Sequence, residues 1–206
     1  MVSQTIRSPA PAVRQLNRPC ATATPLTFLF LRRPPTVSNT LIIGDSIVRY
    51  VSVKGCETRC FPGTKVDDMN IIIPSLLSEE GHESLVVHVG VNDTKAGTSE
   101  LIKEDFKRLL DTLWETGKTI AISGPLPCLN RGDMKYSRLR QLHSWLKECC
   151  WFWNIPYINN FTLFSNRHDL FNRDGVHLNR LGAKLLSVNI SDTVRTLFSK
   201  ILLQSP

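Results

Sequence analysis

The chain has 206 residues, of which 42% are hydrophobic, which suits one domain with a sizeable core rather than two. Its net charge of +7 is distributed unevenly, because residues 1–39 contain five arginines and no acidic residue. Residues 40–206 hold 20 basic and 18 acidic side chains, a balance of only +2. The composition therefore argues against a strongly basic nucleic-acid-binding domain.

Residues 1–39 are predicted to form a disordered, basic, Pro-rich arm, and residues 40–206 a folded domain. The arm holds six of the twelve prolines and many small polar residues, so it buries too little apolar surface to offset the entropy lost on ordering. Its clustered arginines make weak contact with RNA or another polyanion possible. The apolar run at 25–31 is too short for a membrane span.

The six cysteines show no spacing typical of a zinc site, and a domain of this size does not need disulfide bonds. We therefore expect reduced and mostly buried thiols, with no metal. This favours a cytoplasmic or nuclear protein over a secreted one.

From residue 40 onward, β-rich runs alternate with helical patterns, which is typical of a parallel sheet covered by helices on both faces. The expected strands are 40–44, 57–61, 84–90, 118–124 and 155–159. The expected helices are 64–77, 99–117, 134–153 and a last one from about residue 179. The prediction is a three-layer α/β/α sandwich with a flavodoxin-like sheet of order 2-1-3-4-5.

A proline in one predicted helix and an aromatic run at the end of another lead to two further expectations. Pro74 should kink or end the helix at 64–77, because proline lacks the N–H that a helix interior needs. The aromatic run Trp151-Phe152-Trp153 precedes the last strand, and we expect it at the edge of the core. Contact with an acyl chain or with a partner is the alternative for this run.

Small and polar residues follow the strands at the sheet edge where ligands bind in such folds. Ser46 could act as a nucleophile if His177 took its proton and Asp174 fixed the imidazole tautomer. The backbone N–H groups of Ser46 and Gly63 and the side-chain amide of Asn92 could then stabilise an oxyanion. Each has a simpler interpretation alone, since serine often caps helices, glycine forms turns and asparagine ties loops.

Four short motifs in order give these residues a joint meaning. They are "GDS" at 44–46, "PGT" at 62–64, "GVND" at 90–93 and "DGVH" at 174–177. With them the chain resembles the SGNH (GDSL-type) hydrolase family over roughly residues 40–200. The resemblance implies a serine esterase or lipase-like hydrolase without metal or cofactor. It also implies Ser46 as nucleophile, Asp174 and His177 as its triad partners, and Ser46, Gly63 and Asn92 as the oxyanion hole.

The segments "LIIGDSIVR" and "RDGVHLNRLGA" also resemble esterase modules in the first-ORF proteins of vertebrate LINE-type retrotransposons. Because the chain leaves little length for a lid, we expect hydrolysis of short acyl esters, such as acetyl esters, of a small molecule or lipid. The alternative is a catalytically vestigial assembly or nucleic-acid-associated module derived from a retroelement. Nothing in the sequence specifies an oligomeric state.

Overall fold

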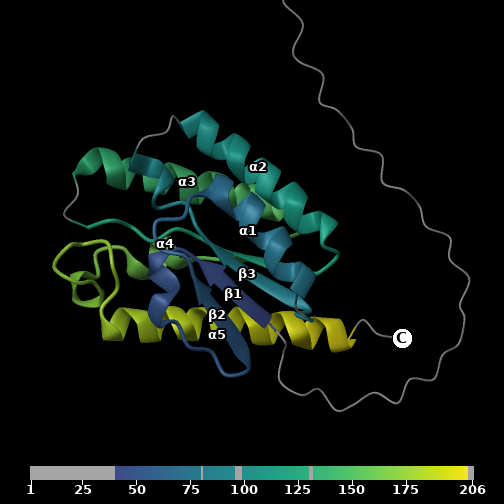
Figure 1. Ribbon diagram of the computed structural model, residues 1–206. Helices are drawn as coiled ribbons and strands as arrows, with labels where there is room; N and C mark the ends of the chain where they lie inside the picture. Colours follow the sequence, from purple (N-terminus) through teal and green to yellow (C-terminus); the bar gives the residue numbers. More distant parts are fainter. Residues whose placement is uncertain (1–39, 80, 96–98, 130–131, 204–206) are drawn as a thin grey trace, which may run out of the picture. The chain divides into compact units, whose positions relative to one another are not determined.

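The computed structural model describes residues 40–79, 81–95, 99–129 and 132–203 (Figure 1). The predicted arm, residues 1–39, lies outside these ranges, so its disorder, its RNA contact and the domain boundary stay predictions. Among the residues that are described, no helix has both the length and the apolar character that a membrane span requires.

The described domain is built on five parallel strands in the order β2-β1-β3-β4-β5. This confirms the predicted fold class and strand order. β1 lies between β2 and β3, with Thr40 level with Cys56 and Ser84. The strands are β1 (Thr40–Gly44), β2 (Cys56–Cys60), β3 (Ser84–His88), β4 (Thr119–Ser123) and β5 (Tyr157–Ile158).

The last strand is shorter than the predicted 155–159, for a local reason. The N–H of Ile155 donates to the carbonyl of Cys150 at the end of the preceding helix. Pro156 has no N–H to donate. The β5 ladder therefore begins only at Tyr157.

In the described part of the chain, five α-helices and three short 3-10 helices connect and cover these strands. The α-helices are α1 (Val66–Glu79), α2 (Ser99–Glu115), α3 (Asp133–Phe152), α4 (Asn160–Phe164) and α5 (Arg180–Leu203). The 3-10 helices are η1 (Ser46–Tyr50), η2 (Asp93–Lys95) and η3 (His168–Leu170).

Pro74 does not end α1, which continues to Glu79. Proline removes the donor that would reach the carbonyl of Asn70, a cost to the helix. The apolar side chains on both sides of it, Ile73, Leu76 and Leu77, pack against the core beneath. This tertiary packing outweighs the lost hydrogen bond, and sequence propensity alone does not reveal it.

Two hydrophobic cores lie on opposite faces of the sheet, because successive strand residues point to opposite sides. Leu41 and Ile43 of β1 pack in one core with α1, α2 and α3. Ile42 packs in the other with η1, α4 and α5. Figure 1 shows α1, α2 and α3 together above the sheet and α5 below it.

The aromatic run at the end of α3 differs from the prediction. Trp151 and Phe152 are 84% and 80% exposed, so they do not lie at the core edge. Trp153 does pack against the core and contacts Trp114 of α2 with ring centroids 6.3 Å apart. The helix carries the first two rings outward because only one face of α3 meets the sheet.

The cysteines within the described ranges all carry free thiols. Cys128 and Cys150 are buried, whereas Cys56, Cys60 and Cys149 are only partly buried. Most of the described thiols are therefore only partly buried, which differs from the expectation of mostly buried thiols.

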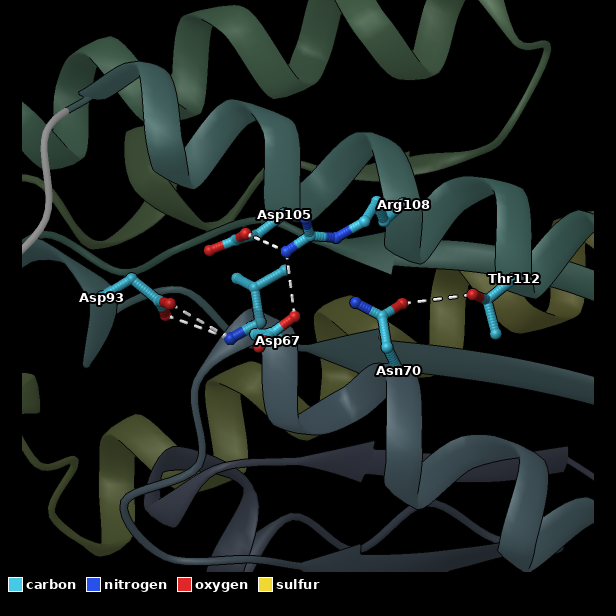
Figure 2. A network of polar contacts seen from close by, with 7 residues as sticks. Asp67, Asn70, Asp93, Asp105, Arg108 and Thr112 are labelled. Carbon is cyan, nitrogen blue, oxygen red and sulfur yellow. Dashed lines mark hydrogen bonds and ion pairs between the residues drawn. The ribbon is translucent and has the colours of Figure 1, made fainter.

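Hydrogen bonds and ion pairs join the start of α1 to the loop after β3 and to α2 (Figure 2). The carboxylate of Asp93 accepts from the N–H of Val66 at 3.1 and 3.3 Å. Arg108 of α2 bridges Asp67 at 3.0 Å and Asp105 at 2.6 Å. These contacts fix the position of the loop that precedes α1, and this loop contains Gly63.

Candidate active site

The first turn after β1 orients Ser46 through its neighbour Asp45. Asp45 is buried and is the N-cap of η1, where its carboxylate accepts from the N–H of Ile47 at 2.9 Å. The interpretation of Ser46 as the helix cap is therefore wrong, and its hydroxyl is left for another contact. Gly44 must be glycine here, because a Cβ would collide with the carbonyl oxygen of His88 on β3.

Ser46, His177 and Asp174 form a continuous hydrogen-bonded chain. Ser46 Oγ lies 3.1 Å from His177 Nε2, and His177 Nδ1 lies 2.6 Å from Asp174 Oδ2. A carboxylate can only accept, so Nδ1 donates to Asp174, and in the neutral imidazole Nε2 is the atom that can accept from the serine hydroxyl. The three residues predicted as a triad from the sequence are thus brought together, across 131 positions between Ser46 and His177.

Asp174 is held in the charged form that this arrangement requires. Partial burial alone would raise its pKa, but the hydrogen bonds from the His177 ring and from the N–H groups of Val176 and His177 outweigh burial. Together they lower the pKa of Asp174 to about 2. The carboxylate therefore stays ionised throughout the neutral and mildly acidic range, and it can stabilise an imidazolium beside it.

Gly63 lies in a tight turn between β2 and α1. The N–H of Thr64 donates to the carbonyl of Phe61 at 3.2 Å, which closes a four-residue turn with Pro62 and Gly63 in its centre. The φ of Gly63 is +83°, which glycine adopts without strain and other residues do not. Since the closing bond uses Thr64, the N–H of Gly63 is not needed by the turn.

Asn92 follows β3 and reaches both neighbouring loops. Its amide Nδ2 donates to the carbonyl of Thr64 at 3.1 Å and lies 3.4 Å from Asp45 Oδ2. One amide hydrogen therefore ties the loop that carries Gly63. The other makes only a long contact with the residue that caps η1.

Three residues outside the predicted site hold its loops in place through hydrogen bonds. Asp45 contacts both the serine turn and Asn92, the Thr64 carbonyl fixes the amide, and Asp93 anchors α1. The preference of aspartate for N-cap positions could have identified Asp45. Thr64 and Asp93 lie in the "PGT" and "GVND" motifs, but the motifs do not show which loops their contacts join.

A buried polar chain supports the site from below on the α5 side of the sheet. His88 Nδ1 and Ser123 Oγ are 3.0 Å apart, and Asn160 Nδ2 donates to Ser123 Oγ at 2.8 Å. Asn189 of α5 donates to Asn160 Oδ1 at 2.8 Å. Burial lowers the pKa of His88 to about 4, so this histidine stays neutral and has a structural role.

The site is open to solvent on the side of the triad. The side chains of His177 and Asp174 are 47% and 36% exposed. Within the described ranges, no three His, Cys, Asp or Glu side chains gather where they could hold a metal ion.

Comparisons with known proteins connect this geometry to a family. No protein-family model and no curated protein matches the chain. Among solved structures, the esterase domain of the ZfL2-1 ORF1 protein from the zebrafish ZfL2-1 retrotransposon is 44% identical, and the match covers 76% of this chain and 98% of that domain. Its TM-score of 0.47 is too low to add a structural argument, so the relationship rests on sequence identity.

Two more distant structures share the fold. A lipolytic protein of the G-D-S-L family from Veillonella parvula is 18% identical with a TM-score of 0.66, covering 74% of this chain and 96% of that one. The acetyl xylan esterase AlAXEase is 17% identical with a TM-score of 0.63, covering 75% and 99%. The four motifs in order and the identity to the zebrafish domain lead to one conclusion: the chain belongs to the SGNH (GDSL-type) hydrolase family, with the retrotransposon ORF1 esterase domain among its relatives.

Proposed function

We propose that the chain is a serine esterase that hydrolyses carboxylic esters with short acyl groups through an acyl-Ser46 intermediate. The observation that carries this proposal is the hydrogen-bonded chain from Ser46 Oγ through His177 to Asp174. A serine hydroxyl is a weak nucleophile until a base within hydrogen-bond reach takes its proton. His177 Nε2, at 3.1 Å, is within that reach.

In the acylation step, Ser46 Oγ attacks the ester carbonyl carbon while its proton passes to His177 Nε2. The ionised Asp174 stabilises the imidazolium that forms. The carbonyl oxygen becomes an oxyanion, which the proposal assigns to the N–H groups of Ser46 and Gly63 and the amide of Asn92. When the tetrahedral intermediate collapses, the bond to the alkoxy oxygen breaks, His177 returns the proton to that oxygen, and the alcohol leaves.

In the deacylation step, a water molecule attacks the acyl carbon of acyl-Ser46, and His177 Nε2 takes the proton of the water. Collapse of the second tetrahedral intermediate breaks the bond to Ser46 Oγ. His177 then protonates Oγ, the carboxylic acid leaves, and the starting hydroxyl is restored.

The amide of Asn92 is already oriented by its bond to the Thr64 carbonyl. The second amide hydrogen makes only the 3.4 Å contact with Asp45, so little is lost when it turns to a developing oxyanion. Catalytic hydrogen bonds of this type tighten in the transition-state complex.

The preference for short acyl groups is supported by the openness of the site. His177 and Asp174 are each exposed by a third or more of their side-chain area, which fits a shallow site rather than a deep acyl tunnel. One structural neighbour is an acetyl xylan esterase, and this supports an acetyl group as the first one to test. The alcohol can belong to a small molecule or a lipid.

The acyl preference is tested with p-nitrophenyl esters of increasing acyl length, measuring kcat/KM for each. We expect the highest value for acetate and a steady fall with chain length. The reaction is also quenched with acid, and the acetyl group is mapped by peptide mass spectrometry to the peptide that contains Ser46. Higher values for long-chain esters would refute the short-acyl proposal, and an unmodified Ser46 with active turnover would refute the intermediate.

The vestigial-module hypothesis makes the opposite prediction for the same assay. It expects a folded protein that binds RNA through residues 1–39 and turns over none of these esters. The intact hydrogen-bonded chain at Ser46 favours the esterase.

A further inference from the structure

A hollow of about 680 Å³ lies on the α5 side of the sheet, along the loop that carries His177. It is bounded by the end of η1, by the loop before α5 and by the first two turns of α5. Tyr50 lies on one side of it and Leu178 on the other, and Leu178 directly follows His177. The hollow therefore begins at the residue next to the proposed catalytic base.

The charged side chains that line this hollow are all basic. Arg180 and Lys184 line it, and no acidic residue does. They lie four residues apart on α5, so they project from the same face of the helix. Both are exposed.

These two cations differ from several others in the fold. Arg59, Arg108 and Arg167 each form an ion pair with a nearby acidic side chain. The ion pairs found within the described ranges include neither Arg180 nor Lys184. The nearby Asp169 carboxylate is already bound by Arg167 through two contacts, at 2.9 and 2.8 Å. Within the described ranges, no ion pair therefore neutralises the positive charge in the hollow.

The position of the hollow relative to the triad indicates which part of an ester it would meet. The proposed oxyanion donors Gly63 and Asn92 follow β2 and β3, and α1 and α2 then cover the opposite face of the sheet. His177 lies on the other side of Ser46 and must reach the alkoxy oxygen to protonate it. The alcohol part of the ester therefore leaves on the side of His177, and the next residue, Leu178, lines the hollow.

We infer that the hollow is a subsite for a phosphate group carried by the alcohol part of the ester, bound by the Arg180 guanidinium and the Lys184 ammonium. A guanidinium matches two phosphate oxygens with parallel N–H donors, and an ammonium adds a compact charge. Hydrolysis would release the carboxylic acid and a phosphorylated alcohol, with the phosphate ester bond left intact. This inference rests on the proposed esterase function and names the substrate class of the same site.

The test compares two acetyl esters: acetoxyethyl phosphate, and its dimethyl phosphate counterpart, which has no charge and two added methyl groups. For the wild-type chain, kcat/KM should be higher for the charged ester. In the Arg180→Gln/Lys184→Gln variant, the ratio of the two values should fall about tenfold, since each exposed ion pair contributes a modest factor. The wild-type ratio should also fall as salt is added.

The matched control is Arg140→Gln/Lys147→Gln on α3, which removes the same charge on the opposite face of the sheet. It should leave the ratio at the wild-type value. Equal kcat/KM for both esters in the wild type, or an unchanged ratio in the Arg180/Lys184 variant, would overturn the inference. An equal fall in the control variant would also overturn it, because a general effect of net charge would then explain the preference.

A binding measurement separates this inference from the proposed function. Ethyl phosphate is titrated into the full chain and followed by NMR at the backbone amide of Leu178. Saturable shifts in the wild type that are lost in Arg180→Gln/Lys184→Gln support the subsite even if neither ester is hydrolysed. The absence of saturable shifts in the wild type contradicts the subsite, whatever the turnover of the uncharged ester.

Discussion

Asp45 connects the two halves of the proposed catalytic apparatus through a single carboxylate. One oxygen accepts from the N–H of Ile47 and so fixes the turn that presents Ser46. The other lies near the Asn92 amide. Asp45, between Gly44 and Ser46 in the first motif, therefore positions the proposed nucleophile, and its burial keeps both contacts out of competition with water.

Gly63 gives a test at the same scale, because its backbone conformation and its proposed role depend on each other. At φ +83° an alanine would be strained by about 1–2 kcal/mol, although its Cβ would meet no atom within 4 Å. The turn is expected to relax and to redirect its N–H. For Gly63→Ala we therefore predict a tenfold or greater fall in kcat for p-nitrophenyl acetate, with a lower free energy of unfolding.

Gly117 offers a matched control for this substitution. It also has a positive φ, +64°, and open space at its Cβ, but it lies between α2 and β4 at the opposite edge of the sheet. Gly117→Ala should lose similar stability in urea unfolding and keep the wild-type kcat. If both variants lose kcat equally, the effect comes from stability and Gly63 has no role in the oxyanion hole.

The anchoring of α1 at Asp93 makes stability depend on pH. Burial raises the pKa of Asp93 to about 6 from an ordinary 3.8, despite the N–H of Val66 that it accepts. A raised folded-state pKa means that the neutral acid is favoured in the fold. The contribution of the protonated Asp93 to the free energy of unfolding is fully present below about pH 4, and it is lost as pH rises through about 6.

Asp93→Asn removes this titration while keeping an oxygen for the Val66 N–H. As pH rises from 4 to 7.5, the free energy of unfolding of the wild type should fall by about 2 kcal/mol relative to the variant. Urea unfolding of both proteins across this range measures the difference. His88, whose pKa is shifted in the opposite direction from its own ordinary value, is present in both proteins and cancels. Parallel pH profiles would show that Asp93 does not titrate as described.

Most elements of this fold are predictable from sequence, because the spacing of apolar residues indicates which side chains are buried. The nearly continuous apolar runs of β3 and β4 indicate strands covered on both faces, and the structure has strands there. The structure differs from the expectations where tertiary contacts decide, as at Pro74, where packing lets α1 continue rather than end. Trp151 and Phe152 were misjudged because hydrophobicity alone does not tell which face of a helix end meets the sheet.

For the molecule as a whole, the candidate site was more predictable than its surroundings. The strand order predicts that the loops after β1, β2 and β3 converge, and the motifs name the residues in them. The cations at Arg180 and Lys184 had no such signal, since surface residues on a helix show no pattern that identifies a hollow beside them. Thr64 and Asp93 stand in the motifs, but their contacts span about 28 residues, and a single sequence does not show these pairings.

The proposed function of the whole molecule depends on the catalytic role of Ser46. The most direct test of this role is to measure p-nitrophenyl acetate hydrolysis by the wild-type chain, Ser46→Ala and Ser144→Ala. Ser144 is an exposed serine on α3, across the sheet from the site, and serves as the control. We predict turnover by the wild type and the control, and a loss of at least about 1,000-fold in kcat for Ser46→Ala with unchanged circular dichroism. Comparable turnover by the folded Ser46→Ala variant, or none by the folded wild type, would contradict the proposed esterase mechanism.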